Sequence, residues 1–124
     1  MKIELMQMAG RDGDTAYNLQ RTLQAIASCA DDADLLVFPE TQLTGFVNAA
    51  QLAAVAEPLN GPSLQAVQRA ARERNVAVVI GLAENDNGSF YNTSVLVTPD
   101  GIALSYRKTH LWPDERGLFV PGDR

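Results

Sequence analysis

The chain has 124 residues, of which 46% are hydrophobic, enough for one domain with an ordinary core and too few for two. Its 15 acidic residues outnumber its 10 basic ones, and the longest basic cluster is Arg107-Lys108, so the charge pattern of a nucleic-acid-binding protein is absent and anionic membranes are disfavoured. No apolar run approaches the roughly 20 residues that span a bilayer, the opening MKIELMQMAG does not resemble a signal peptide, and the single cysteine, Cys29, fits a reducing compartment. We therefore expect a cytoplasmic protein.

The first half of the chain alternates between strand and helix patterns. Residues 2 to 8 alternate in polarity and predict a strand, and the polar stretch GRDGD ends it. Asp14 is a plausible N-cap of a helix that ends near Asp31, because apolar residues follow at helical spacing. The expected inner face of this helix contains Ala16, Leu19, Leu23, Ile26, Ala27 and Ala30. The apolar run LLVF at 35 to 38 predicts a short buried strand, which Pro39 ends.

The second half continues the alternation and then changes to consecutive strands. In the turn NGPS, Ser63 can cap a second helix that ends near Asn75 and packs through Leu64, Val67, Ala70 and Ala71. A buried strand is expected at 76 to 82, followed by strands at about 90 to 97 and 102 to 108 that the turn TPDG joins. The order β α β α β β β predicts an α/β domain with a mostly parallel sheet that ends in an antiparallel hairpin. Gly10 and Gly13 match neither dinucleotide nor P-loop fingerprints.

Two charged residues lie where the predicted sheet would place a site. Glu40 comes directly after the carboxyl end of a buried strand, the edge at which open α/β sheets bind ligands, and Pro39 restricts the backbone before it. By parity Lys108 continues the face of Ile102, Leu104 and Tyr106, so it is aimed along the buried side. Position alone also fits a solvated glutamate and a lysine that reaches water. Together, the two residues can supply a general base and a cation that stabilises an oxyanion.

The sequence resembles the nitrilase superfamily of carbon-nitrogen hydrolases. The resemblance is carried by LLVFPET with Glu40, YRKTHLW with Lys108, the LxGPS turn before the second helix and the strand FYNTSV, and it covers essentially the whole chain. Each motif is weak by itself, but their order and spacing make the set specific. The resemblance implies the N-terminal half of an αββα sandwich, so residues 1 to 124 are expected to form a carbon-nitrogen hydrolase domain that is incomplete on its C-terminal side.

Members of this family use a Glu-Lys-Cys triad in which the cysteine forms a thioester or thioimidate. By motif, the resemblance makes Glu40 the general base, Lys108 the group that stabilises the tetrahedral intermediate, and Glu115 a second glutamate that orients substrate and lysine. His110 and Trp112 would line or support the same loop. The resemblance implies homo-oligomers and small amide or nitrile substrates, and neither metal nor cofactor is expected.

The nucleophile is the missing member of the triad. In the family it follows a strand beyond the FxPGD segment, and the present sequence stops at PGDR. Cys29 lies in the predicted first helix without a neighbouring histidine or lysine, so we interpret it as a small buried hydrophobe. We therefore expect an amidase whose cysteine lies outside this chain. Two alternatives stay open, a glutamine-hydrolysing domain of an ammonia-using synthetase and a non-catalytic assembly or binding module.

Overall fold

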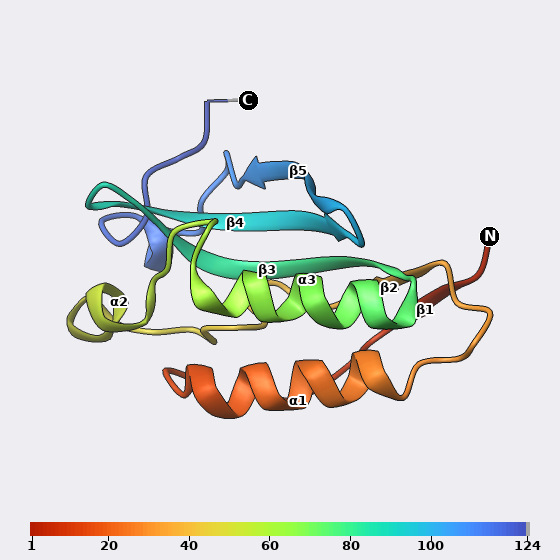
Figure 1. Ribbon diagram of the computed structural model, residues 1–124. Coiled ribbons are helices and arrows are strands. Elements are labelled where there is room, and N and C mark those ends of the chain that lie inside the picture. Colours follow the sequence, from red (N-terminus) through yellow and green to blue (C-terminus); the bar gives the residue numbers. More distant parts are fainter. Residues whose placement is uncertain (124) are drawn as a thin grey trace.

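The computed structural model describes residues 1 to 123 as one mixed sheet with two helices packed along one of its faces (Figure 1). The elements are β1 (Ile3–Leu5), α1 (Thr15–Ala27), β2 (Leu35–Val37), α2 (Ala49–Val55), α3 (Pro62–Arg74), β3 (Ala77–Asp86), β4 (Ser89–Thr98), β5 (Gly101–Arg107) and a 3₁₀ turn, η1 (Pro113–Glu115). The strands lie in the order β1-β2-β3-β4-β5. β1, β2 and β3 pair in parallel, whereas β3, β4 and β5 are antiparallel. The predicted α/β class and hairpin are confirmed.

The order of elements differs from the prediction by one helix. The segment AAQLAAV forms α2, which begins after Asn48 in a reciprocal capping box with Gln51 and buries only Leu52. Its short length and weak apolar stripe explain why periodicity did not reveal it. β3 is also longer than expected and runs to a tight turn at Asn87 and Gly88, both with positive φ. These φ values suit a two-residue hairpin loop.

The core lies between the sheet and the pair α1 and α3 (Figure 1). Ile26 of α1 and Val67 of α3 meet Val78, Ile80 and other apolar side chains of the sheet. Asp14 caps α1 as predicted, by accepting a hydrogen bond from the Tyr17 amide. None of the helices within residues 1 to 123 is long and apolar enough to span a membrane.

The buried face of α1 is partly polar, which the apolar spacing did not predict. Ala16 and Ala27 are exposed, whereas Asn18 and Thr22 are buried. Asn18 donates to the Leu43 carbonyl at 3.2 Å, and the Thr22 hydroxyl accepts from the Gln42 side chain at 3.1 Å. Buried polar groups require such partners. These two residues therefore fasten α1 to the loop that follows β2.

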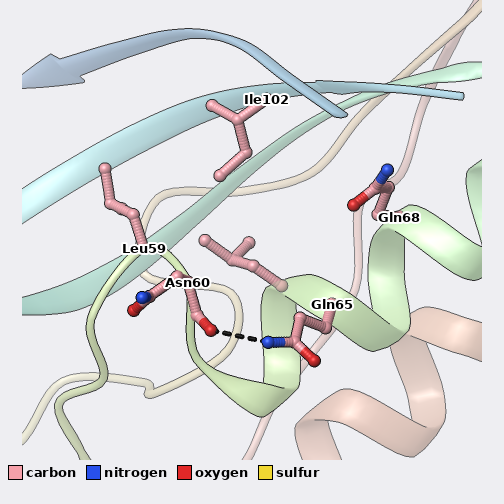
Figure 2. A pocket seen from close by; sticks show the side chains of 6 residues that line it. Leu59, Asn60, Gln65, Gln68 and Ile102 are labelled. Carbon is pink, nitrogen blue, oxygen red and sulfur yellow. Dashed lines mark hydrogen bonds between the residues drawn. The ribbon is translucent and has the colours of Figure 1, made fainter. Parts of the chain in front are cut away.

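The opposite face of the sheet carries no helix in the described part of the chain. Leu5, Leu104 and Tyr106 lie on this open face with 76%, 67% and 52% of their surface exposed. The expectation that Ile102 shares their face is wrong, because the register shifts between Leu96 and Val97 and leaves Ala103 as an extra residue. Ile102 therefore turns toward α3 (Figure 2). The face predicted to be buried is open in residues 1 to 123.

Candidate active site

Glu40 is held by a loop that is anchored to two elements. β2 ends at Val37, the Phe38 amide donates to the Val79 carbonyl, and Pro39 then leads to Glu40. Beyond it, the Leu43 amide donates to the carbonyl of Gly81 in β3, while the contacts of Asn18 and Thr22 tie the loop to α1. The loop that carries the Glu40 carboxylate is therefore held by β3 and by α1.

Thr41, next to Glu40, has an unusual backbone conformation. Its φ is 49°, a value that β-branched residues rarely adopt, and it is 2% exposed. Its hydroxyl has no hydrogen-bond partner among residues 1 to 123. The loop passes so close to β3 at this point that a Cβ on Gly81 would lie 2.6 Å from the Thr41 nitrogen. Strain of this kind clusters at functional sites, where the surrounding structure must maintain it.

Lys108 lies one residue beyond β5, and its backbone is paired on both sides. Its amide donates to the Asn92 carbonyl at 2.8 Å, and its carbonyl accepts from the Gly122 amide at 2.9 Å. The side chain reaches across the sheet edge to two carboxylates. Nζ lies 2.9 Å from Oε1 of Glu40 and 2.8 Å from Oε1 of Glu115. The structure thus brings together the three charged residues predicted from the sequence.

Glu115 closes the cluster from the last position of η1. Its Oε1 accepts from the Trp112 amide at 3.1 Å as well as from Lys108. Burial by itself would raise the pKa of Glu115, but the hydrogen bonds from Lys108, Asn92 and the Trp112 amide outweigh burial and lower it. Glu115 is therefore ionised at neutral pH.

Lys108 is likewise charged. Burial would lower the pKa of Lys108, but its contacts with Glu115 and Glu40 raise it above its ordinary value. A lysine kept protonated cannot act as a nucleophile or a base, whereas it can stabilise a negative charge that develops beside it. The cluster carries two carboxylates and one ammonium, so its chemistry is that of a general base next to a fixed cation.

Asn92 is a member of this cluster that was not predicted from the sequence. Its side-chain nitrogen donates to Oε1 of Glu40 at 2.7 Å and to Oε2 of Glu115 at 2.9 Å. Asn92 lies within the strand FYNTSV and is 5% exposed. Its neighbours in β4, Thr93 and Ser94, are also polar, so the sequence pattern does not distinguish Asn92, and its role follows from the buried partners that the fold supplies.

The other predicted site residues lie at the periphery or elsewhere. Trp112 is 72% exposed, and His110 is exposed without a side-chain hydrogen bond to any residue from 1 to 123. Their supporting roles stay predictions. Cys29 lies one residue after Ser28, the C-cap of α1, rather than inside the helix, and it is buried in the core. Residues 1 to 123 contain no group of three His, Cys, Asp or Glu side chains placed to hold a metal ion.

Glu40 and Lys108 line a cavity of about 480 Å³ on the open face of the sheet. Val37, Val79, Gly81 and Tyr106 are among its other lining residues. This size suits a small molecule, and the lining combines apolar side chains with a few convergent polar groups. A second hollow lies between α3 and β5, where Gln65 donates to the Asn60 carbonyl at 2.7 Å (Figure 2). It is lined by amides and aliphatic side chains without a titratable group, so it offers no acid-base chemistry.

Comparison with known proteins identifies the family of this chain. A family model described as carbon-nitrogen hydrolase matches residues 2 to 124. An (R)-stereoselective amidase from a Pseudomonas species is 72% identical over 124 residues, which are all of this chain and 45% of that protein.

Two solved structures are also similar. One is XC1258 from Xanthomonas campestris, a CN-hydrolase superfamily protein (27% identity, TM-score 0.88, 98% of this chain and 46% of that one). The other is a double mutant of the amidase from Nesterenkonia sp. AN1 in complex with acrylamide (28% identity, TM-score 0.86, 100% and 49%). The chain spans about half the length of each.

Proposed function

Because the chain belongs to the carbon-nitrogen hydrolase family, we propose that it forms the glutamate- and lysine-bearing half of an amidase for small amides. The observation that carries the proposal is the position of Lys108 Nζ between Glu40 and Glu115, at 2.9 and 2.8 Å. The similarity to the Pseudomonas amidase favours amides over nitriles, and the acrylamide complex of the Nesterenkonia amidase indicates the size of substrate.

In the proposed reaction Glu40 acts as the general base. It takes the proton from a cysteine thiol, whose sulfur forms a bond to the amide carbon, and Lys108 stabilises the oxyanion of the tetrahedral intermediate. The C–N bond then breaks, ammonia leaves with a proton returned by Glu40, and a thioester remains. Glu40 then accepts a proton from water, whose oxygen forms a bond to the thioester carbon. The C–S bond breaks, Glu40 returns the proton to the sulfur, and the acid and the thiol are released.

We place the nucleophilic cysteine outside residues 1 to 124. Cys29 is buried in the core between sheet and helices, whereas the cavity with Glu40 and Lys108 lies on the open face. The open face itself supports a second half of the domain, because exposed apolar side chains such as Leu5, Leu104 and Tyr106 favour a covering layer. The relatives, about twice as long as this chain, have residues available for such a layer. Cytoplasmic location and homo-oligomers stay predictions.

The test is ammonia release by the full-length gene product from a panel of small amides, glutamine and nitriles. We expect hydrolysis of amides, and we expect the Glu40→Gln variant to lose about 10²- to 10⁴-fold in kcat, the usual contribution of a general base. Glu73→Gln makes the same chemical change at an exposed position of α3 and serves as the matched control. Full activity of Glu40→Gln would refute the role of Glu40, and preference for glutamine would support the synthetase alternative.

A further inference from the structure

Asn92 occupies the centre of the Glu40, Lys108 and Glu115 cluster. It lies in β4, where its backbone pairs with Ala83 of β3 and its carbonyl accepts the Lys108 amide at 2.8 Å. The backbone of Asn92 is therefore satisfied by the sheet and its extension. The hydrogen bonds that its side chain makes within residues 1 to 123 go only to the two carboxylates of the cluster.

Both hydrogens of the Asn92 amide nitrogen are used by these contacts. Nδ2 donates to Glu40 Oε1 at 2.7 Å and to Glu115 Oε2 at 2.9 Å. Lys108 bridges the same two residues through their Oε1 atoms, so the four side chains form a closed ring. Two carboxylates at this spacing repel each other, and the ring places a charged and a neutral donor between them. The side-chain nitrogen of asparagine carries two donor hydrogens and no charge, so Asn92 can donate to both carboxylates at once without changing the net charge of the ring.

The two carboxylate oxygens of Glu40 differ in their hydrogen-bond partners within the ring. Oε1 accepts both the Asn92 and the Lys108 hydrogen bonds, whereas Oε2 accepts none from residues 1 to 123. A carboxylate oxygen that already accepts two strong hydrogen bonds is a poor site for a proton. Glu40 also lines the cavity on the open face of the sheet. Oε2 is thus the Glu40 atom with free lone pairs.

We propose that Asn92 is a positioning residue of the reaction, which holds Glu40 and Glu115 on either side of Lys108 and leaves Oε2 of Glu40 as the proton-accepting atom. The proposal rests on the proposed amidase function. Asn92 also lines the cavity beside Glu40 and Lys108, and the role proposed for it is exerted through its hydrogen bonds to the two carboxylates.

The protonation of Glu115 supports this arrangement and provides a readout that does not depend on catalysis. Burial raises the pKa of Glu115, and the hydrogen bond from Asn92 is one of those that bring it below the ordinary value. The charged side chains that share the ring with Glu115 are Lys108, in direct contact, and Glu40, which accepts from both donors, and Asp114 and Arg116 flank Glu115 in sequence. Loss of the Asn92 donor should therefore raise the pKa of Glu115.

The experiment uses Asn92→Asp and Asn92→Ser in the full-length enzyme, with Asn60→Asp as control. Aspartate keeps the shape of asparagine but has no donor when ionised, and serine keeps only one donor. Asn60 is exposed and lies beside the second hollow (Figure 2), so its variant makes the same charge change away from the ring. We expect kcat to fall about 100-fold in both Asn92 variants, the loss associated with displacing a reacting group by about 1 Å. The control should match the wild type.

The second readout is the side-chain carboxyl titration of Glu115, followed by ¹³C NMR in the wild type and in Asn92→Ser. We expect the titration midpoint of Glu115 to move upward in the variant, with thermal unfolding showing that the protein is folded. A kcat within a few-fold of wild type in folded Asn92→Ser would overturn the positioning role. If the wild type hydrolyses no amide, the proposed function fails, and an unchanged Glu115 titration in Asn92→Ser would separately overturn the assignment of Asn92.

Discussion

Gly81 provides a sharp test of how the Glu40 loop is positioned. This residue of β3 pairs with Ser94 of β4 and lies directly below the loop. A Cβ at Gly81 would lie 2.6 Å from the Thr41 nitrogen and 3.2 and 3.3 Å from the carbonyl carbon and Cα of Glu40. All three are backbone atoms, so the clash cannot be relieved by rotating a side chain.

The distances give the size of the expected movement. An ordinary contact begins at 3.4 Å, so Gly81→Ala must move the loop by about 0.8 Å. β3 pairs with β4 along almost its whole length, and Gly81 itself pairs with Ser94, so we expect the backbone of Glu40 and Thr41 to move rather than the strand. A displacement of about 1 Å at a reacting group costs about 100-fold in rate, and overpacking costs about 1–3 kcal/mol of stability.

The assay is kcat for amide hydrolysis by the full-length enzyme together with its thermal unfolding. Gly88→Ala is the control, because Gly88 has φ +90° in the hairpin turn and an added Cβ would meet no atom within 4 Å. We expect Gly88→Ala to lower the free energy of unfolding by about 1–2 kcal/mol through backbone strain and to leave kcat unchanged. A wild-type kcat in Gly81→Ala would refute the prediction that close packing of the loop on Gly81 positions Glu40.

Further substitutions test the rest of the account in the full-length enzyme. Lys108→Met should reduce kcat by about 10²- to 10³-fold, as expected for the loss of an oxyanion-stabilising donor, and steady-state kinetics measure this. The pKa of Glu115 is lowered in the folded protein, so its ionised form stabilises the fold fully above the ordinary pKa of 4.5. This stabilisation is lost as the pH falls through the folded-state pKa. In urea unfolding, Glu115→Gln should therefore lose less stability than the wild type as the pH is lowered. Arg107→Met should lower the free energy of unfolding by about 3 kcal/mol, because Glu84, 5% exposed and paired with Arg107 at 2.7 Å, would be left buried without its cation. Cys29→Ala should retain full kcat and lose about 1 kcal/mol of stability in urea unfolding.

Much of the fold followed from the sequence because local and tertiary signals agree. Asp14 caps α1, Asn75 ends α3 in the left-handed conformation, and the turn between Thr98 and Gly101 joins β4 to β5. The proximity of Glu40 and Lys108 could also be expected, since Glu40 lies three residues after β2 and Lys108 one residue after β5, and both strands end at the same end of the sheet.

The remaining features depend on contacts that no local pattern contains. Asn92 is buried because two residues distant in sequence accept its hydrogen bonds, and only the folded sheet brings them together. Ser63 was predicted as an N-cap, but Gly61 occupies the cap position and the Ser63 side chain instead donates to Glu57. The expected shared face of Ile102 and Leu104 fails at a register shift that depends on how β4 and β5 pair. Tertiary contacts decide such positions over intrinsic propensity.

In the proposed reaction Glu40 activates a cysteine outside residues 1 to 124 for attack on an amide. The test is mass spectrometry of the full-length enzyme, quenched during a single turnover. The intact mass detects a covalent adduct, and the peptide masses after digestion locate it. We expect an acyl adduct, equal in mass to the amide minus ammonia, on a cysteine beyond Arg124, and we expect it to be absent in Glu40→Gln. An adduct on Cys29, or one that forms at the wild-type rate in Glu40→Gln, would contradict it.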